Sequence, residues 1–181
     1  MKIPWKGAVI LSIFALLIFT PLGTFINNKI ILLLSPSPKQ SEKTEQITEY
    51  TGYFLDNKDQ KITLQSFENE VVIINFWATW CSPCLAEKPS FQKLYEDYKD
   101  KIKFAFITQE TPIEVKNFLE KHHYTIPIYY EAVNLPELLS VKNIPTTFIL
   151  DKKGNIIIKQ IGATDWNSKK IRELLDKLTK N

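Results

Sequence analysis

The sequence predicts an α/β fold, a sheet with helices on both faces, and three observations carry this prediction. Residues 71–77 (Val-Val-Ile-Ile-Asn-Phe-Trp) form an uninterrupted apolar, β-branched run, which is typical of a central strand buried on both sides. Strand-like and helix-like segments then alternate along the chain. Near the C-terminus, the polar residues 151–155 separate two strand-like segments and predict a closing hairpin.

The other elements follow from local patterns. Two short strand-like segments, 53–56 and 61–64, flank a polar turn and predict a hairpin before the central strand. Apolar residues at helical spacing predict a helix from Pro83 to about Tyr98, which Pro89 should kink. The remaining predicted elements are strands at 103–107, 126–130, 146–150 and 156–161, and helices at 112–121, at 135–139 behind Asn134, and at 168–179 with Ser168 as its cap.

The charge pattern speaks against nucleic acid as a partner. The 181 residues carry a formal net charge of only +3, because 23 basic residues are nearly matched by 20 acidic ones. No basic stripe is interleaved with aromatic residues. The hydrophobic fraction of 44% is enough for one soluble domain with a core and a further segment.

The N-terminal residues predict a single membrane-spanning helix. From Gly7 to Ile26 the chain has no charged residue, and a helix of about twenty residues spans the hydrocarbon core. Lys2 and Lys6 precede this segment, so we expect the N-terminus in the cytoplasm and the rest outside it. A cleaved signal peptide is the alternative, although no small-x-small cleavage site follows. Either way the domain is extracytoplasmic, at the periplasmic side of the inner (plasma) membrane.

The chain therefore divides into three parts. Residues 1–34 are the expected anchor, and their second apolar run, 30–34, is too short to span and should lie at the membrane interface. Residues 35–46 are proline-containing and polar, which predicts a semi-rigid linker. Residues 47–181 are the expected folded domain.

The chemistry is expected at the two cysteines, Cys81 and Cys84, which lie three residues apart. A bridge between them would close a very short loop and restrain little of the unfolded chain, so the pair suits reversible redox chemistry better than structural bracing. Both follow the predicted central strand at the start of a helix, where free N–H groups and the helix dipole favour a thiolate at Cys81. Cys81 is the candidate nucleophile and Cys84 the resolving thiol.

A metal site is the competing interpretation of two nearby cysteines. Zinc usually requires four protein ligands, and the chain has no third cysteine. His122 and His123 are the only histidines, and they lie near the end of a predicted polar helix. A zinc site built from these four residues and a copper relay with one histidine stay open as alternatives. Surface histidines, no metal and no cofactor are the preferred expectation.

The surroundings of the cysteines resemble the thioredoxin superfamily. Residues 75–84 (Asn-Phe-Trp-Ala-Thr-Trp-Cys-Ser-Pro-Cys) resemble its active-site stretch, and residues 85–89 (Leu-Ala-Glu-Lys-Pro) extend the similarity to the membrane-tethered TlpA/ResA branch. Residues 143–148 resemble its cis-proline loop. The resemblance runs from about residue 47 to the C-terminus. It implies a thioredoxin-like fold with a central mixed sheet, extra N-terminal strands and an insert around 109–140.

The resemblance also implies roles for individual residues. Pro145, preceded by Ile144, would be cis, and its loop would lie against the disulfide and offer backbone groups to an extended substrate. An ordinary trans proline that opens a strand is the alternative. Trp80 is expected at the apolar rim around Cys81, whereas Trp77 is expected in the core.

Two positions bear on proton transfer. Asn75 stands where thioredoxin has a buried aspartate, so that proton acceptor for the resolving thiol is missing. Glu87, one turn after Cys84, matches the acidic residue of the TlpA/ResA branch and is the candidate for proton transfer or substrate selection. The alternative is a solvated glutamate on the helix surface.

The implied activity is thiol–disulfide exchange with protein thiols and disulfides, supported by a membrane electron-donor protein. Pro83 before Cys84 and Ile144 before Pro145 favour a reductant, for example in cytochrome c maturation, although direction depends on potentials and partners. The alternatives are a thiol oxidase of exported proteins and a non-catalytic metal or cytochrome-assembly scaffold. A thiol peroxidase would need a Pro-x-x-x-Thr-x-x-Cys motif, which the sequence lacks.

Overall fold

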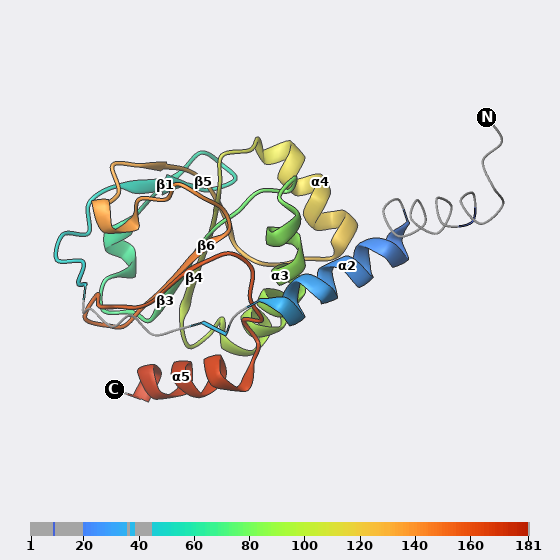
Figure 1. Cartoon of the computed structure of the whole chain (residues 1–181). Helices are drawn as coiled ribbons and strands as arrows, with labels where there is room; N and C mark the ends of the chain where they lie inside the picture. The colour runs from blue at the N-terminus through green and yellow to red at the C-terminus, as the bar shows by residue number, and fades with distance from the viewer. Residues whose placement is uncertain (1–8, 10–19, 36, 39–44, 181) are drawn as a thin grey trace.

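A seven-stranded mixed sheet forms the centre of the protein (Figure 1). The computed structural model describes residue 9 and residues 20–35, 37–38 and 45–180. Within these, the strand order is β2-β1-β5-β4-β3-β6-β7. The predicted central strand is β3 (Val72–Phe76), which is parallel to β4 (Lys103–Thr108) and antiparallel to β6 (Thr146–Leu150).

The sheet edges are formed by the hairpins predicted from the sequence. The first hairpin pairs β1 with β2 antiparallel, and the second pairs β6 with β7. β1 joins the rest of the sheet through β5, which in turn is parallel to β4. The bounds of these strands are β1 Tyr53–Leu55, β2 Lys61–Thr63, β5 Ile128–Val133 and β7 Ile156–Ile161.

The long helices after β3 pack on one face of the sheet. Val71, Ile73 and Trp77 point to this face and share one apolar cluster with residues of all three helices. Two crossovers, from β3 to β4 and from β4 to β5, step across the sheet in the same direction, and right-handed crossovers then place both helices on the same side. These helices are α3 (Ser82–Tyr98), α4 (Pro112–His122) and α5 (Lys169–Lys180).

The opposite face is covered by short 3₁₀ turns and by the chain before β1. Ile47, Phe54 and Leu139 belong to the second apolar cluster, together with Val72 and Ile74 of β3. The turns are η1 (Leu64–Phe67) and η2 (Glu137–Leu139). The expectation of helices on both faces is therefore wrong for the described α-helices, and 3₁₀ turns take their place.

The predicted helix at 135–139 is shorter than expected. η2 begins after Pro136, and its bond from Ser140 N–H to Glu137 O, 2.9 Å long, closes a single 3₁₀ turn. Asn134 does not cap it. Instead Asn134 has a φ of 53° and turns the chain at the end of β5. The helix α3, in contrast, runs from Ser82 to Tyr98 and contains Pro89, close to the predicted bounds.

A further helix, α2 (Pro21–Leu34), precedes the domain and lies beside α3 (Figure 1). Thr20 caps it, because its hydroxyl accepts a 3.1 Å hydrogen bond from Gly23 N–H. Residues 30–34 are thus the last part of this helix. The expected span at 7–26 falls mostly outside the described residues. Among the helices that are described, none has the length and apolarity needed to cross a membrane.

The chain before β1 is hydrogen-bonded to the turn of the β6–β7 hairpin. Ile156 N–H donates to Glu45 O at 2.8 Å, and Ile47 N–H donates to Gly154 O at 2.9 Å. Gly154 has a φ of 80°, and a Cβ there would lie 2.6 Å from Ile47 O, so the turn requires glycine. This turn lies at the opposite end of the sheet from Cys81, because Leu150 pairs with the first residue of β3.

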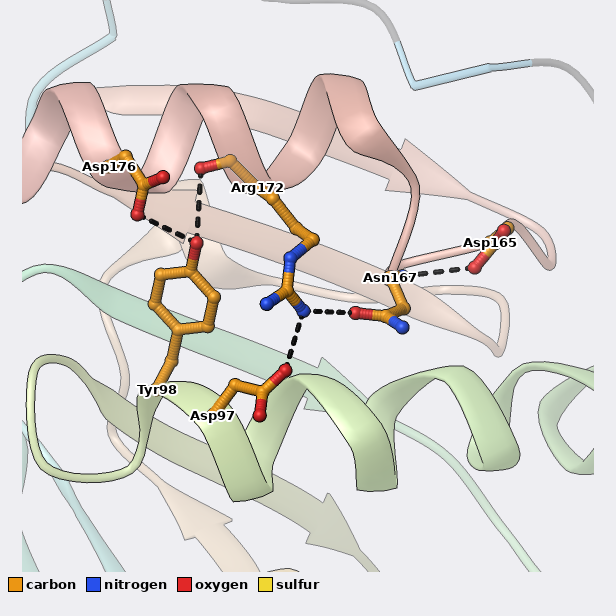
Figure 2. A network of polar contacts seen from close by, with 6 residues as sticks. All are labelled: Asp97, Tyr98, Asp165, Asn167, Arg172 and Asp176. Atoms are coloured by element: carbon orange, nitrogen blue, oxygen red, sulfur yellow. Dashed lines mark hydrogen bonds and ion pairs between the residues drawn. The ribbon is translucent and has the colours of Figure 1, made fainter.

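Side chains at the C-terminal end of α3 hold α5 in place (Figure 2). The Tyr98 hydroxyl donates to Asp176 Oδ1 at 2.7 Å. The Arg172 guanidinium donates to Asp97 Oδ2 at 2.8 Å and to Asn167 Oδ1 at 2.7 Å. Burial, followed by the neighbouring Asp176, raises the pKa of Tyr98 to about 12, so the hydroxyl stays a donor at physiological pH.

Candidate active site

Cys81 and Cys84 form a disulfide at the start of α3. Cys81 is the N-cap of the helix, and its sulfur accepts a 3.3 Å hydrogen bond from Cys84 N–H. The two residues differ in exposure, since Cys81 is 6% exposed and Cys84 is completely buried. A partner can therefore reach the disulfide only from the side of Cys81.

The local sequence explains why the pair lies at this junction. β3 ends at Phe76, and Trp77 N–H still donates to Ile107 O of β4 at 3.0 Å. The chain then turns, with Cys81 N–H donating to Ala78 O at 3.3 Å, and α3 begins with proline in its first turn. The buried strand and the helix start predicted from the sequence thus place the cysteines at one end of the sheet.

The loop of Pro145 lies at the same end of the sheet. The Ile144–Pro145 peptide bond is cis, and the next residue, Thr146, pairs with Phe76 at the end of β3. Gly162 N–H donates to Pro145 O at 2.8 Å. One lone pair of the Pro145 carbonyl is therefore engaged within the protein.

A cavity of about 610 Å³ opens beside the disulfide. Trp80 and Ile144 both line it, which brings the two expected substrate-binding side chains together. Trp80 is 73% exposed, whereas Trp77 is buried, so the two tryptophans differ as the sequence suggested. The expected insert around 109–140 also lines the cavity, with Gln109, Glu110 and Pro136 among its lining residues.

Glu87 lies in the core rather than on the surface of α3. Its side chain is completely buried, which excludes the solvated alternative. Oε1 accepts a 2.9 Å hydrogen bond from Asn75 Nδ2, and Oε2 accepts one of 2.9 Å from Trp166 Nε1. The backbone of Thr164 contributes another. Glu87 and Cys84 are three residues apart on α3, so both face the same side of the helix.

Asn75 connects Glu87 to a second buried charged residue, Lys88. The Asn75 Nδ2 group donates to Glu87 and also to Thr147 Oγ1 at 2.8 Å. The Asn75 Oδ1 atom accepts a 2.8 Å hydrogen bond from Lys88 Nζ. Like Glu87, Lys88 has no exposed surface. Asn75, which stands where thioredoxin has an aspartate, is thus the centre of a buried polar network.

Burial moves the pKa values of both charged groups toward neutrality. It raises the pKa of Glu87 to about 7, while the positive charge of Lys88 and the hydrogen bonds from Trp166 and Asn75 act in the opposite direction. Burial also lowers the pKa of Lys88 to about 7, opposed by the negative charge of Glu87. This end of the core can therefore exchange a proton near physiological pH.

Aromatic rings surround the Lys88 ammonium. Its Nζ lies 4.1 Å from the ring centroid of Trp77, 4.8 Å from that of Phe106 and 5.5 Å from that of Phe91. The ring faces attract the cation and replace part of the hydration that burial removes. Among the described residues, the Trp77 Nε1 group is buried without a hydrogen-bond partner.

The loop before the cysteines is held by Glu110. Its Oε2 accepts a 2.7 Å hydrogen bond from Thr79 N–H, and its Oε1 accepts one from the Thr79 hydroxyl. Thr108 also donates to Oε2 at 3.1 Å. This carboxylate fixes the backbone two residues before Cys81.

Sequence reasoning missed four polar residues of this site: Lys88, Glu110, Thr147 and Trp166. Lys88 did leave a local signal, since it lies four residues after Cys84 and therefore on the buried face of α3. The other three come from distant parts of the chain. No local pattern marks them.

The histidines lie apart from the cysteines. The ring of His122 is 4.5 Å from that of Phe118 and 5.9 Å from that of Tyr124, measured between centroids. Within the described part of the chain, no group of three or more His, Cys, Asp and Glu residues gathers in a way that could hold a metal ion.

A family model for redoxins matches residues 39–176, which include the whole site. The chain belongs to the redoxin family. This redoxin is 34% identical over 127 residues to the thiol-disulfide oxidoreductase ResA of Bacillus cereus, a match that covers 68% of this chain and 72% of that protein. It is 32% identical over 121 residues to the thioredoxin-like protein YneN of Bacillus subtilis, covering 65% and 70% of the two chains.

Solved structures agree with this family. A Bacteroides vulgatus protein provisionally assigned as a thiol-disulfide oxidoreductase superposes with a TM-score of 0.61 at 27% identity, covering 76% of this redoxin and 99% of that chain. StoA of Bacillus subtilis superposes with a TM-score of 0.54 at 22% identity and shares the fold, covering 72% and 98%. The protein is a ResA-like thiol–disulfide oxidoreductase with a thioredoxin-like fold.

Proposed function

We propose that this redoxin reduces protein disulfides outside the cytoplasm, with Cys81 as the nucleophile and Cys84 as the resolving thiol. The observation that carries the proposal is the unequal position of the two sulfurs at the start of α3. Cys81 retains exposed surface and caps the helix, whereas Cys84 has no exposed surface. An incoming disulfide therefore meets Cys81, and the N–H of Cys84 is already directed at the Cys81 sulfur.

The reaction is a two-electron exchange. The Cys81 thiolate attacks one sulfur of the substrate disulfide, forms a mixed disulfide, and releases the other substrate sulfur as a thiolate that takes up a proton. Cys84 then loses its proton and attacks Cys81, so the Cys81–Cys84 bond forms and the second substrate thiolate leaves. The two enzyme thiols are oxidised, and the substrate disulfide is reduced to two thiols.

Glu87 is the proposed proton acceptor for Cys84. The two residues lie one turn apart on the same side of α3, and both are buried. No bulk water reaches a buried thiol, so an internal base is needed to make the attacking thiolate. The pKa of Glu87, raised to about 7 by burial, suits a group that takes and returns a proton near neutral pH.

The substrate is proposed to lie across Trp80 and the loop of Ile144 and Pro145. Both Trp80 and Ile144 border the cavity beside the disulfide, which offers an apolar place for a side chain next to the substrate cysteine. An extended peptide would bond backbone groups of the Pro145 loop. These contacts supply orientation rather than chemistry.

The location and partners of the enzyme form the finer part of the proposal. The uncharged stretch at 7–26, preceded by Lys2 and Lys6, supports a single-pass anchor in the inner (plasma) membrane with the domain on the periplasmic side. A tethered reductant needs electrons from a membrane electron-donor protein. Protein disulfides, including those formed during cytochrome c maturation, are the proposed substrates.

Insulin reduction tests the catalytic proposal. The full chain should reduce insulin with a chemical reductant as electron source, and Cys81→Ser should abolish this activity. The reduction potential of the Cys81–Cys84 pair then tests the direction of electron flow. A value of about −270 mV fits a reductant, whereas a value of about −120 mV means an oxidase and contradicts the proposal.

Trapping and topology test the partners and the location. Cys84→Ser should accumulate mixed disulfides at Cys81 with substrate proteins, which Cys81→Ser does not. Alkaline phosphatase fused after the domain should be active, and the enzyme should resist extraction with alkaline carbonate. An inactive fusion, or release by carbonate, would refute the proposed anchor and orientation.

A further inference from the structure

Lys88 is a buried cation that the exchange mechanism described so far does not use. A lysine is rarely buried completely unless a partner compensates its charge. Here Nζ donates a 2.8 Å hydrogen bond to the amide oxygen of Asn75, and aromatic rings lie around the remaining ammonium. This costly arrangement lies one helical turn from Cys84.

The first effect of Lys88 is on the orientation of Asn75. An asparagine amide has one accepting and one donating side, and the two can be exchanged by a half-turn of the group. Because Lys88 can only donate, Oδ1 of Asn75 must face it. The donating side is then directed at Glu87 Oε1 and at Thr147 Oγ1. A neutral residue at position 88 would remove this constraint.

The second effect is on the charge of Glu87. Within the described residues, Lys88 is the one charged group that stabilises the Glu87 carboxylate, and Glu87 is the one that stabilises the Lys88 ammonium. The Asn75 amide joins them through two hydrogen bonds. The carboxyl group of Glu87 and the amino group of Lys88 are thus linked through one amide.

We infer that Lys88 is a positioning residue of the exchange reaction, whose ammonium fixes the Asn75 amide and balances the charge of Glu87, so that Glu87 can ionise in the core beside Cys84. The inference rests on the proposed role of Glu87 as proton acceptor. In addition, it states that the protonation of Glu87 depends on Lys88, a residue that contacts neither the substrate nor the sulfur atoms. Burial raises the pKa of Glu87 and lowers that of Lys88, and the charge of each residue opposes the shift of the other.

Other charged groups lie too far out to replace either partner. α4 contributes His122, but the ring of Phe118 lies between it and Trp77. The only charged residue of α2 is Lys29, which is exposed. The segment before α5 turns Asp165 to the surface.

The strands packed against the pair present uncharged side chains. These are Asn75, Thr147 and Phe106. On α3 itself, the neighbours toward the N-terminus are the cysteines, which are bonded to each other in the oxidised protein. The Glu87 carboxylate therefore depends on Lys88 for its compensating charge.

A purely structural role is the competing explanation, in which Lys88 only fills space between Trp77, Phe91 and Phe106. Lys88→Met separates the two explanations. Methionine keeps the length and much of the volume of the side chain but removes the charge and the donor. A filling role predicts unchanged protonation of Glu87. The inferred role predicts a Glu87 carboxyl that is harder to ionise.

The primary measurement is the titration of Glu87 in the oxidised full chain, followed by the carbon-13 signal of its carboxyl group and assigned with Glu87→Gln. In Lys88→Met the midpoint should rise by at least about one pH unit, which corresponds to about tenfold less carboxylate at lower pH. Lys93→Met is the matched control, because Lys93 is an exposed lysine of the same helix. Equal midpoints in wild type and Lys88→Met would overturn the inference.

Activity supplies the second measurement. The pH profile of insulin reduction by Lys88→Met should shift upward, with about tenfold lower turnover at neutral pH. In a Glu87→Gln background, the same substitution should have no further effect on the profile, because Lys88 acts through Glu87. An equal loss in both backgrounds would mean that Lys88 acts independently, and would overturn the inference.

A third measurement requires no substitution at position 88. Two interacting groups titrate as a pair, so the Glu87 carboxyl carbon of the wild type should show a second, smaller inflection when Lys88 loses its proton. A single inflection would contradict the pairing. The titrations use oxidised protein and involve no turnover. Failure of insulin reduction would therefore refute the proposed function, while an unchanged Glu87 titration would refute only the role of Lys88.

Discussion

The carboxylate of Glu110 accepts hydrogen bonds from both the backbone N–H and the hydroxyl of Thr79. The two residues are 31 positions apart, and Glu110 follows β4 while Thr79 follows β3. Because these strands are neighbours and parallel, their C-terminal ends meet. The active-site loop is thus fastened to the adjacent strand, immediately before Trp80 and Cys81.

Glu110→Gln should therefore loosen the active-site loop. The neutral amide presents one accepting atom instead of two, so the charge-assisted hydrogen bonds to Thr79 are weakened, at a cost of about 1 kcal/mol. We expect roughly fivefold slower insulin reduction from the poorer alignment of Cys81. Glu120→Gln, at an exposed position of α4, is the control and should retain full activity. A Glu110→Gln enzyme with normal turnover would show that this contact does not align the loop.

Thr147→Val should destabilise the fold while preserving the shape of the side chain. Asn75 Nδ2 would lose one of its two acceptors in a region without exposed surface. An unsatisfied buried donor costs about 1–3 kcal/mol, and urea unfolding measures this loss directly. Thr51→Val, at an exposed position, should change the free energy of unfolding by no more than about 0.5 kcal/mol.

Tyr98→Phe tests the contact between α3 and α5 that Figure 2 shows. The change removes the 2.7 Å hydrogen bond to Asp176 and should lower the free energy of unfolding by about 1–2 kcal/mol. Insulin reduction should be unaffected, because the site lies at the other end of α3. Glu173→Gln, which breaks only an exposed pair with Lys169, should cost at most about 0.5 kcal/mol. Equal stability of the two variants would contradict this interpretation.

The buried pair should give stability an unusual dependence on pH. The pKa of Glu87 is raised from 4.5 to about 7, so the folded protein holds an extra proton in this range, and the contribution to stability is lost as pH rises through it. The pKa of Lys88 is lowered from 10.5 to about 7, so above neutrality the unfolded chain binds more protons and stability increases with pH. The contribution of the pair is lowest near pH 7.

Urea unfolding at pH 5, 7 and 9, with the disulfide intact, measures this contribution. The reference is the double variant Glu87→Gln/Lys88→Met, which keeps similar side-chain shapes without the charges. The difference in unfolding free energy between wild type and double variant should be smallest near neutral pH. A difference that does not vary with pH would show that the pair does not titrate in this range.

The strand segments along the chain and the position of the cysteines after the central strand could be predicted because both depend on local pattern. The apolar run at 71–77 forms β3, and the hairpin predicted near the C-terminus forms β6 and β7. The placement of the helices could not be predicted from alternation alone. Which face a helix covers depends on the direction in which the next strand is added, and this is a property of the whole sheet.

The polar network beneath the disulfide was predicted only in part. Glu87 and Asn75 could be predicted because they belong to the stretch around the cysteines that resembles the thioredoxin superfamily. Their partners Thr147 and Trp166 are 72 and 79 residues away from the groups they contact, and only the sheet and the loop before α5 bring them together. The helical spacing from Cys84 places Lys88 on the buried face of α3, but lysines are normally surface residues. Its burial depends on rings from other elements.

The N-terminal segment touches the domain repeatedly before the first strand. α2 lies against α3, Pro38 O accepts a 2.7 Å hydrogen bond from Lys170 Nζ, and Glu45 bonds the turn at the far end of the sheet. These contacts hold the described parts of this segment against the domain. With the proposed anchor in the bilayer, the disulfide stays close to the membrane. Partners held in the same membrane then have a higher effective concentration at the disulfide than partners that diffuse freely.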